Sequence, residues 1–251
     1  MGLPARLTPE LRARIQASFD EAAGDEQHFP STIDRRIFHV KLISEHLGPL
    51  AGRRVLDVGC ASGYLGAILA SRGYLVTGID SPGVARAGFP ESIELLEADL
   101  DRGLPPLTGR FDFVICADVL EHLRRPERLL RELRAVLATG GRLAASLPNS
   151  GHAYFRWNVL TGRFPAEERG LFDRTHVYFY TWRGWLDLFH AGGFSIETVR
   201  CSGVPIGLAL PKWEGSAWVR ALERMSYESA RWWKTMFAYQ FIVTAAPEIE
   251  P

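Results

Sequence analysis

The segment RRVLDVGCASGYLG, residues 53–66, sets the architecture expected of this chain. Its apolar run ends at Gly59, and helical spacing begins after Gly63. This order is typical of a buried strand that feeds a tight turn and the first turn of a helix. Glycine suits such a turn because it adopts positive φ and lets a ligand approach the backbone, while the helix start presents N–H donors. The segment therefore predicts a ligand-binding turn.

The alternation of strands and helices continues through the rest of the chain. Strands are expected at residues 53–58, 74–80, 93–99, 111–117, 142–147, 194–201 and 239–245. Helices are expected at residues 8–23, 34–47, 63–72, 126–138, 182–191 and 215–237. Closely spaced strands and helices in this order predict a doubly wound, Rossmann-like α/β sheet. We expect a single domain over residues 1–251, with N-terminal helices in residues 1–50 and acceptor-side insertions at 150–181 and 203–238.

Composition narrows the class of protein. The 251 residues carry 29 basic and 29 acidic side chains, so the formal net charge is zero and no nucleic-acid partner is expected. The cysteines Cys60, Cys116 and Cys201 lie far apart, without a CxxC pair, which is typical of reduced thiols. The N-terminus lacks the apolar core of a signal peptide. We expect a cytoplasmic protein.

Acidic residues around the turn favour one kind of ligand over another. A dinucleotide site needs G-x-G-x-x-G, whereas Ala61 occupies the place of the second glycine here. Asp57, two residues before the turn, would repel a pyrophosphate and attract a cationic ligand. Asp80 ends the next strand, where a carboxylate can accept hydrogen bonds from a ribose diol, and Asp99 can accept one from an adenine amine. The pattern therefore favours S-adenosylmethionine over a nicotinamide dinucleotide.

Four motifs in order carry a family resemblance: VLDVGCASG, GID, EAD and FDFVICADVLEHL, followed by LRELRAVLATGGRLAASLPN. Over residues 53–148 they resemble class I S-adenosylmethionine-dependent methyltransferases. The resemblance implies a seven-stranded, mostly parallel sheet with an antiparallel last strand, and S-adenosyl-L-methionine as cofactor. It implies cofactor contacts at Asp57, Gly59, Cys60, Ala61, Gly63, Asp80, Ser81, Asp99, Leu100, Ala117 and Asp118.

The acceptor side is expected after Asn149. Residues 150–181 contain DRTHVYFYT and are similar to the branch with ubiquinone-biosynthesis-type O-methyltransferases and glycan-linked methyltransferases. This predicts methyl transfer to a small hydroxylated molecule, such as a sugar, a lipid-linked compound or a natural-product intermediate. A histidine is the natural base for a hydroxyl, and we expect His176 first and His122 second, with His152 and Asp173 nearby. A noncatalytic cofactor-binding or scaffold protein of the same fold is the alternative.

Two further features leave alternatives open. Asp118, Glu121 and His122 share a helical face and can hold a divalent cation, although Glu121 can instead pair with Arg124 or Arg125, and we expect no metal. Residues 215–237 form an amphipathic pattern rich in tryptophan and arginine. We expect its apolar face to pack on the sheet; the less favoured alternatives are a peripheral contact with an anionic membrane or a lid over the acceptor.

Overall fold

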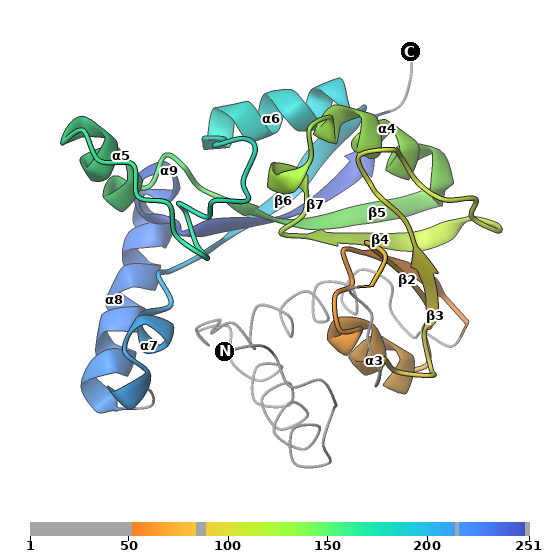
Figure 1. Cartoon of the computed structure of the whole chain (residues 1–251), viewed down its shortest axis with the longest axis horizontal. Coiled ribbons are helices and arrows are strands. Elements are labelled where there is room, and N and C mark those ends of the chain that lie inside the picture. Colours follow the sequence, from red (N-terminus) through yellow and green to blue (C-terminus); the bar gives the residue numbers. More distant parts are fainter. Residues whose placement is uncertain (1–51, 84–88, 214–215, 249–251) are drawn as a thin grey trace.

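A computed structural model describes residues 52–83, 89–213 and 216–248 (Figure 1). The helices expected at residues 8–23 and 34–47 lie outside the described residues. The described chain folds around one seven-stranded sheet with the order β3-β2-β1-β4-β5-β7-β6. The strands are β1 Arg54–Val58, β2 Leu75–Asp80, β3 Glu94–Glu97, β4 Phe111–Ala117, β5 Leu137–Pro148, β6 Phe194–Ser202 and β7 Gln240–Pro247.

Strand directions follow the expected pattern. Neighbours from β3 to β5 pair in parallel, whereas β7 pairs antiparallel with both β5 and β6. Strands buried on both faces need mainly apolar sequences, and β1 and β4 supply them, each with one aspartate, Asp57 or Asp112. The expected seven-stranded sheet with an antiparallel last strand is therefore confirmed.

Helices cover both faces of the sheet (Figure 1). On one face α4 and α6 pack with the strands through buried leucines and aromatics such as Leu130, Trp185 and Phe189. On the other face α3 packs through Leu65 and Leu69. The helices are α3 Tyr64–Ser71, α4 Pro126–Val136, α5 Ala153–Leu160, α6 Trp182–Ala191, α7 Ile206–Ala209, α8 Ala217–Trp232 and α9 Lys234–Phe237, with 3-10 turns η1 Leu120–His122 and η2 Pro211–Trp213.

Three segments differ from their expected form. Residues 150–181 contain a regular helix, α5, capped by the imidazole of His152. The single helix expected at 215–237 is divided into α8 and α9 at Trp233, whose backbone leaves the helical region. β5 begins at Leu137 rather than at residue 142, because its pairing with β4 extends past an irregularity between Phe111 and Phe113.

The expected packing of the apolar face of α8 on the sheet is wrong. Its Trp218, Leu222, Met225 and Trp232 side chains are 44%, 40%, 64% and 80% exposed. The buried residues of α8 are Val219 and Ala230, on another side of the helix. Among the described residues, none of the helices has the length and apolar character needed to span a bilayer.

Candidate active site

The turn after β1 has the conformation that its glycines predict. Gly59 and Gly63 have φ of 73° and 70°, and Ala61 also lies in the left-handed region at 48°. A Cβ on Gly59 would lie 2.4 Å from Val119 Cγ2, and one on Gly63 would lie 2.7 Å from Phe89 Cε2. The backbone therefore approaches its surroundings too closely for a side chain at either position. α3 follows at once, with no side-chain cap on Gly63.

Acidic side chains stand at the carboxyl ends of β1 and β2. Asp57 is only 3% exposed in β1. Asp80 ends β2, and its two carboxylate oxygens accept hydrogen bonds from the backbone N–H groups of Ala61 (2.6 Å) and Ser81 (2.7 Å). The Ala61 bond ties the glycine turn to the end of β2. Each oxygen retains a lone pair for a ligand hydroxyl, as a ribose contact requires.

The thiol of Cys60 packs inward rather than toward a ligand. It is buried, and a Cβ on Gly78 of β2 would lie 2.8 Å from its Sγ. Burial, with Asp57 and Asp80 adding to it, raises the pKa of the Cys60 thiol well above its usual range. Cys60 therefore offers its backbone, and not a thiolate, to anything held by the turn.

Asp99 and Leu100 follow β3, at the same edge of the sheet. The Asp99 carboxylate accepts from the backbone N–H of Asp101 and pairs with Arg102 at 3.2 Å, both side chains being more than half exposed. Leu100 packs against the main core cluster. An adenine contact from Asp99 therefore competes with an exposed ion pair, which is weak and readily exchanged.

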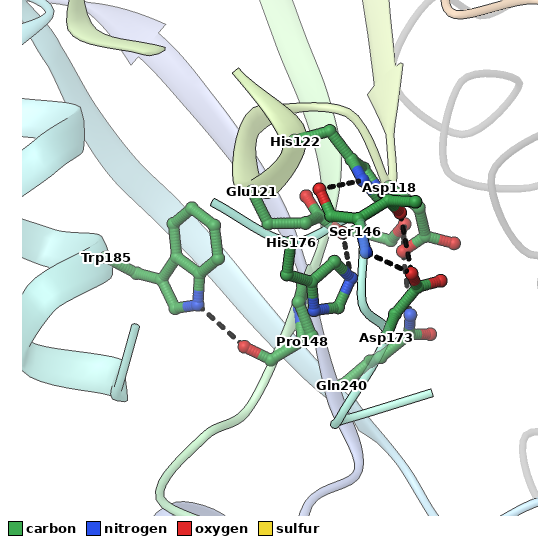
Figure 2. A network of polar contacts seen from close by, with 10 residues as sticks. Asp118, Glu121, His122, Ser146, Pro148, Asp173, His176, Trp185 and Gln240 are labelled. Carbon is green, nitrogen blue, oxygen red and sulfur yellow. Dashed lines mark hydrogen bonds and ion pairs between the residues drawn. The ribbon is translucent and has the colours of Figure 1, made fainter. Parts of the chain in front are cut away.

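Asp118 is held rigidly at the end of β4 by two other strands. Its φ is 55°, and its Oδ1 accepts hydrogen bonds from Ser146 Oγ at 2.8 Å and Gln240 Nε2 at 2.7 Å (Figure 2). A non-glycine residue keeps such a backbone conformation only where its surroundings over-determine it. β4, β5 and β7 thus fix one carboxylate where the parallel strands end, next to Ala117.

Glu121, His122 and His176 form a compact polar cluster (Figure 2). Glu121 is 1% exposed, and its backbone oxygen accepts from the N–H of Val177, which ties η1 to the segment after α5. His176 Nε2 lies 3.9 Å from Glu121 Oε1, and the His122 and His176 rings meet edge to face at 4.7 Å between centroids. The structure therefore brings together both histidines expected as bases, one from η1 and one from the segment after α5.

Burial shifts the ionisation of this cluster. Burial, with Asp118 adding to it, raises the pKa of the Glu121 carboxyl well above its usual range. Glu121 Oε2 is buried and accepts no hydrogen bond from the described residues. Burial and then the neighbouring His122 lower the pKa of His176. His176 therefore favours its neutral form, and Glu121 favours a proton or another cation beside it.

The hydrogen bonds of Thr175 fix the tautomer of His122. The Thr175 hydroxyl lies 2.6 Å from Asp173 Oδ1, so its one proton goes to that carboxylate. His122 Nδ1 lies 3.0 Å from the same hydroxyl oxygen and 3.2 Å from the Thr175 carbonyl oxygen, which can only accept. Nδ1 must therefore carry the proton, and Nε2 presents a lone pair. Asp173 and Thr175 together orient the His122 ring and leave its Nε2 lone pair available.

The cluster also has a donor set for a metal ion. One ligand atom from each of Glu121, His122 and His176 lies within 4.8 Å of the others. This differs from the expected set, because Asp118 is turned to Ser146 and Gln240 instead. Two imidazoles and a carboxylate suit a first-row transition metal, so these residues fit such an ion.

Several residues of the site were not predicted from the sequence. Ser146, Thr175 and Gln240 hold Asp118 and His122, yet only Thr175 had a signal, its place inside DRTH. His152 was expected near the acceptor, but its Nδ1 accepts from the N–H of Tyr154 and caps α5. Burial lowers its pKa to about 4. His152 therefore has a structural function in positioning α5.

The sheet order, the glycine turn and the acidic strand ends together define a class I S-adenosylmethionine-dependent methyltransferase fold. The methyltransferase domain family matches residues 29–199, and the chain belongs to this family. S-adenosylmethionine is its cofactor, and the turn tied to Asp80, whose carboxylate oxygens retain lone pairs for a ribose, fits that ligand.

Curated relatives are similar over part of their length. The chain is 32% identical over 146 residues to a ubiquinone biosynthesis O-methyltransferase of Pseudomonas aeruginosa (strain LESB58). This alignment covers 55% of this chain and 62% of the relative. The chain is 34% identical over 130 residues to the enzyme of that name from Acinetobacter baylyi, covering 49% and 55%. The chain thus spans less than two thirds of the length of these relatives.

Solved structures share the fold. An S-adenosylmethionine-dependent methyltransferase from Mesorhizobium loti superposes with a TM-score of 0.53 at 22% identity, covering 82% of this chain and 95% of that one. The [4+2]-cyclase SpnF superposes with a TM-score of 0.56 at 20% identity, covering 90% and 85%. At these identities the likeness concerns the fold alone.

Proposed function

We propose that this protein transfers a methyl group from S-adenosylmethionine to a hydroxyl oxygen of a small acceptor. The observation that carries the proposal is the pair of histidines placed beside the fixed Asp118, with one imidazole held as the Nδ1–H tautomer. The names of the curated relatives support oxygen as the methylated atom. A sugar, a lipid-linked compound or a natural-product intermediate is the acceptor class.

Most of the rate enhancement is expected from alignment. When bound, the cofactor supplies a methyl group on a sulfonium, already activated for in-line displacement. Orienting two reactants well can lower a barrier by about 7–11 kcal/mol. Asp57, Asp80 and the turn between them would hold the cofactor, and Asp118, fixed by Ser146 and Gln240, would border its methionine part.

Proton removal from the acceptor hydroxyl is assigned to His122. Its Nε2 lone pair is available because Nδ1–H donates to Thr175, and Asp173 stabilises the imidazolium that forms. His176 has a side chain that is only 6% exposed, and burial lowers its pKa, so we do not assign it as the base. We place His176 behind His122, where its ring supports the His122 ring.

The same cluster would hold a divalent cation if one binds. Glu121, His122 and His176 would be its ligands, and the cation would lower the pKa of a bound acceptor hydroxyl. The base assignment does not require the cation, because a neutral imidazole alone typically contributes about 10²–10⁴ in rate.

The experiment measures S-adenosylhomocysteine formed with labelled S-adenosylmethionine and a panel of hydroxylated acceptors. For an accepted compound, His122→Gln should lower kcat by about 10²–10⁴. Thr175→Val, which removes the orienting hydroxyl, should lower kcat and change the pH profile, whereas Thr175→Ser should retain both. Unchanged turnover in His122→Gln would remove the base assignment without affecting the methyltransferase proposal.

A noncatalytic cofactor-binding protein is the competing function. A fold shared with a cyclase shows that the scaffold alone does not establish methyl transfer. Against that alternative stands the Asp173–Thr175–His122 chain, because such orientation has no use in cofactor binding alone. Tight S-adenosylmethionine binding with no S-adenosylhomocysteine formed from any acceptor class would favour the noncatalytic function.

A further inference from the structure

Helix α8 has two apolar sides, and one of them faces solvent. Val219 and Ala230 are buried against the body of the protein. A second stripe, here called the outer stripe, runs along the exposed side at steps of four, three and seven residues, which keeps its members on one helix face. It consists of Trp218, Leu222, Met225 and Trp232, which are 40–80% exposed.

A row of arginines lies on the other flank of the exposed side of α8. Arg220, Arg224 and Arg231 follow one another at steps of four and seven residues and are all exposed. Arg231 lies 3.5 Å from Glu228, an exposed pair, while Arg220 and Arg224 form no ion pair with a described residue. In projection along the helix, the arginine row and the outer stripe flank a strip that contains Ala217, Ala221 and Glu228, and the side with Val219 lies behind both. The arginines are therefore gathered on one flank of the exposed side and not distributed around the helix.

α5 adds exposed aromatic surface at the same end of the molecule. Figure 1 shows α5 and α9 side by side, with α8 continuing from α9. Asn149 Nδ2 lies 3.4 Å from the carbonyl oxygen of Thr235, which joins the start of α5 to α9. Trp157 and Leu160 of α5 are 64% and 80% exposed. Trp232 and Trp233, at the α8–α9 junction, are 80% and 47% exposed.

We propose that the outer stripe of α8, together with Trp157 and Leu160, docks on an anionic lipid bilayer. Tryptophan prefers the headgroup level of a bilayer, with its ring in the apolar part and its N–H in the polar part. Arginines beside it extend to lipid phosphates. The combination of a charged flank with an aromatic face is the pattern of a helix lying in the membrane surface.

Charge disfavours a second copy of the chain as the occupant. A two-fold interface brings the same patch of both protomers together. The arginine rows of two α8 helices would then approach each other, and like charges across an interface are costly. An anionic bilayer instead complements the row.

The experiment is flotation of the full chain with vesicles of phosphatidylcholine, with or without 30 mol% phosphatidylglycerol. Binding is expected to the anionic vesicles and to weaken at high salt. The variant Arg220→Gln/Arg224→Gln/Arg231→Gln should bind roughly 100-fold more weakly, since each arginine near such a surface contributes about fivefold. The variant Trp218→Ser/Leu222→Ser should also lose binding.

Matched controls change similar residues elsewhere. Leu75→Ser in β2, where Leu75 is 58% exposed, and Arg183→Gln in α6 should bind like the unaltered chain. Circular dichroism and S-adenosylhomocysteine binding check that each variant folds. Absent binding, or equal binding to both vesicle types, would overturn the proposal. A dimer seen by analytical ultracentrifugation would also overturn the proposal, if only the Trp218→Ser/Leu222→Ser variant disrupts it and the dimer does not bind vesicles.

Discussion

Replacing Gly59 by alanine should destabilise the protein and weaken cofactor binding together. The new Cβ would lie 2.4 Å from Val119 Cγ2, on a backbone with φ of 73°. The left-handed conformation costs an L-residue about 1–2 kcal/mol, and overpacking a buried contact costs about 1–3 kcal/mol. The free energy of unfolding should therefore fall by roughly 2–5 kcal/mol.

A matched glycine separates the two costs. Gly162 has φ of 72°, and nothing lies within 4 Å of the position its Cβ would take. Gly162→Ala should therefore cost only the conformational part, about 1–2 kcal/mol. In the double variant Gly59→Ala/Val119→Ala the overlap is removed, so the pair should show a favourable coupling of about 1–3 kcal/mol in a double-mutant cycle.

Urea unfolding measures these stabilities, and titration calorimetry with S-adenosylhomocysteine measures the cofactor site. Gly59→Ala should weaken binding, because relief of the overlap displaces the turn that Ala61 and Asp80 hold together. Gly162→Ala should bind normally. Equal stability losses in the two single variants would refute the packing argument, and unchanged affinity in Gly59→Ala would refute the placement of the cofactor at this turn.

Three other predictions concern single groups. Asp80→Asn should weaken S-adenosylhomocysteine binding about 10–100-fold in calorimetry, because a hydrogen bond to a charged group contributes about 1.5–3 kcal/mol; unchanged affinity would contradict the ribose assignment. The pKa of His152 is about 4 in the folded protein, against its ordinary 6.5. Between these two pH values the unfolded state binds more protons, so the free energy of unfolding falls as the pH decreases. The loss should be about 1.4 kcal/mol per pH unit by urea unfolding, and His152→Gln should abolish it. Methyl transfer should survive exhaustive chelation; a loss restored by Mn²⁺ or Zn²⁺ would instead assign Glu121 to a metal site.

The cofactor side of the molecule was predictable because its signals are local. Strand, turn and helix follow one another within residues 53–72, and the expected strand at 111–117 has the same bounds in the structure. Asp57 and Asp80 could be placed at one edge, because parallel neighbouring strands bring their carboxyl ends together. Such inferences need only the order of elements along the chain.

The partners of Asp118 could not be predicted, for a physical reason. Ser146 and Gln240 lie 28 and 122 residues away and reach Asp118 only because β5 and β7 pair next to β4. The register of that pairing is set by the packed sheet, not by any local pattern. The same holds for His122 and His176, whose meeting depends on the path of residues 149–181.

The exposed stripe of α8 shows the limit of periodicity as a signal. Apolar residues at helical spacing identify a continuous apolar face, but not what covers it. α8 buries a small face containing Val219 and Ala230, so the larger Trp218–Trp232 face remains outside. The buried face has only two apolar residues, so the four large exposed ones dominate the pattern.

The two halves of the site are built in different ways, and His122 lies where they meet. Its chain neighbours belong to the β4–η1 segment that ends the cofactor side, whereas its hydrogen-bond partner Thr175 belongs to residues 150–181, which we propose face the acceptor. A change of acceptor would alter residues 150–181 and leave the cofactor turn intact. The orientation of His122 would change with it, because Thr175 and Asp173 fix the imidazole from that segment. Under the proposed base assignment, acceptor choice and proton removal are coupled through one side chain, and altered specificity and altered pH dependence should then appear together at Thr175.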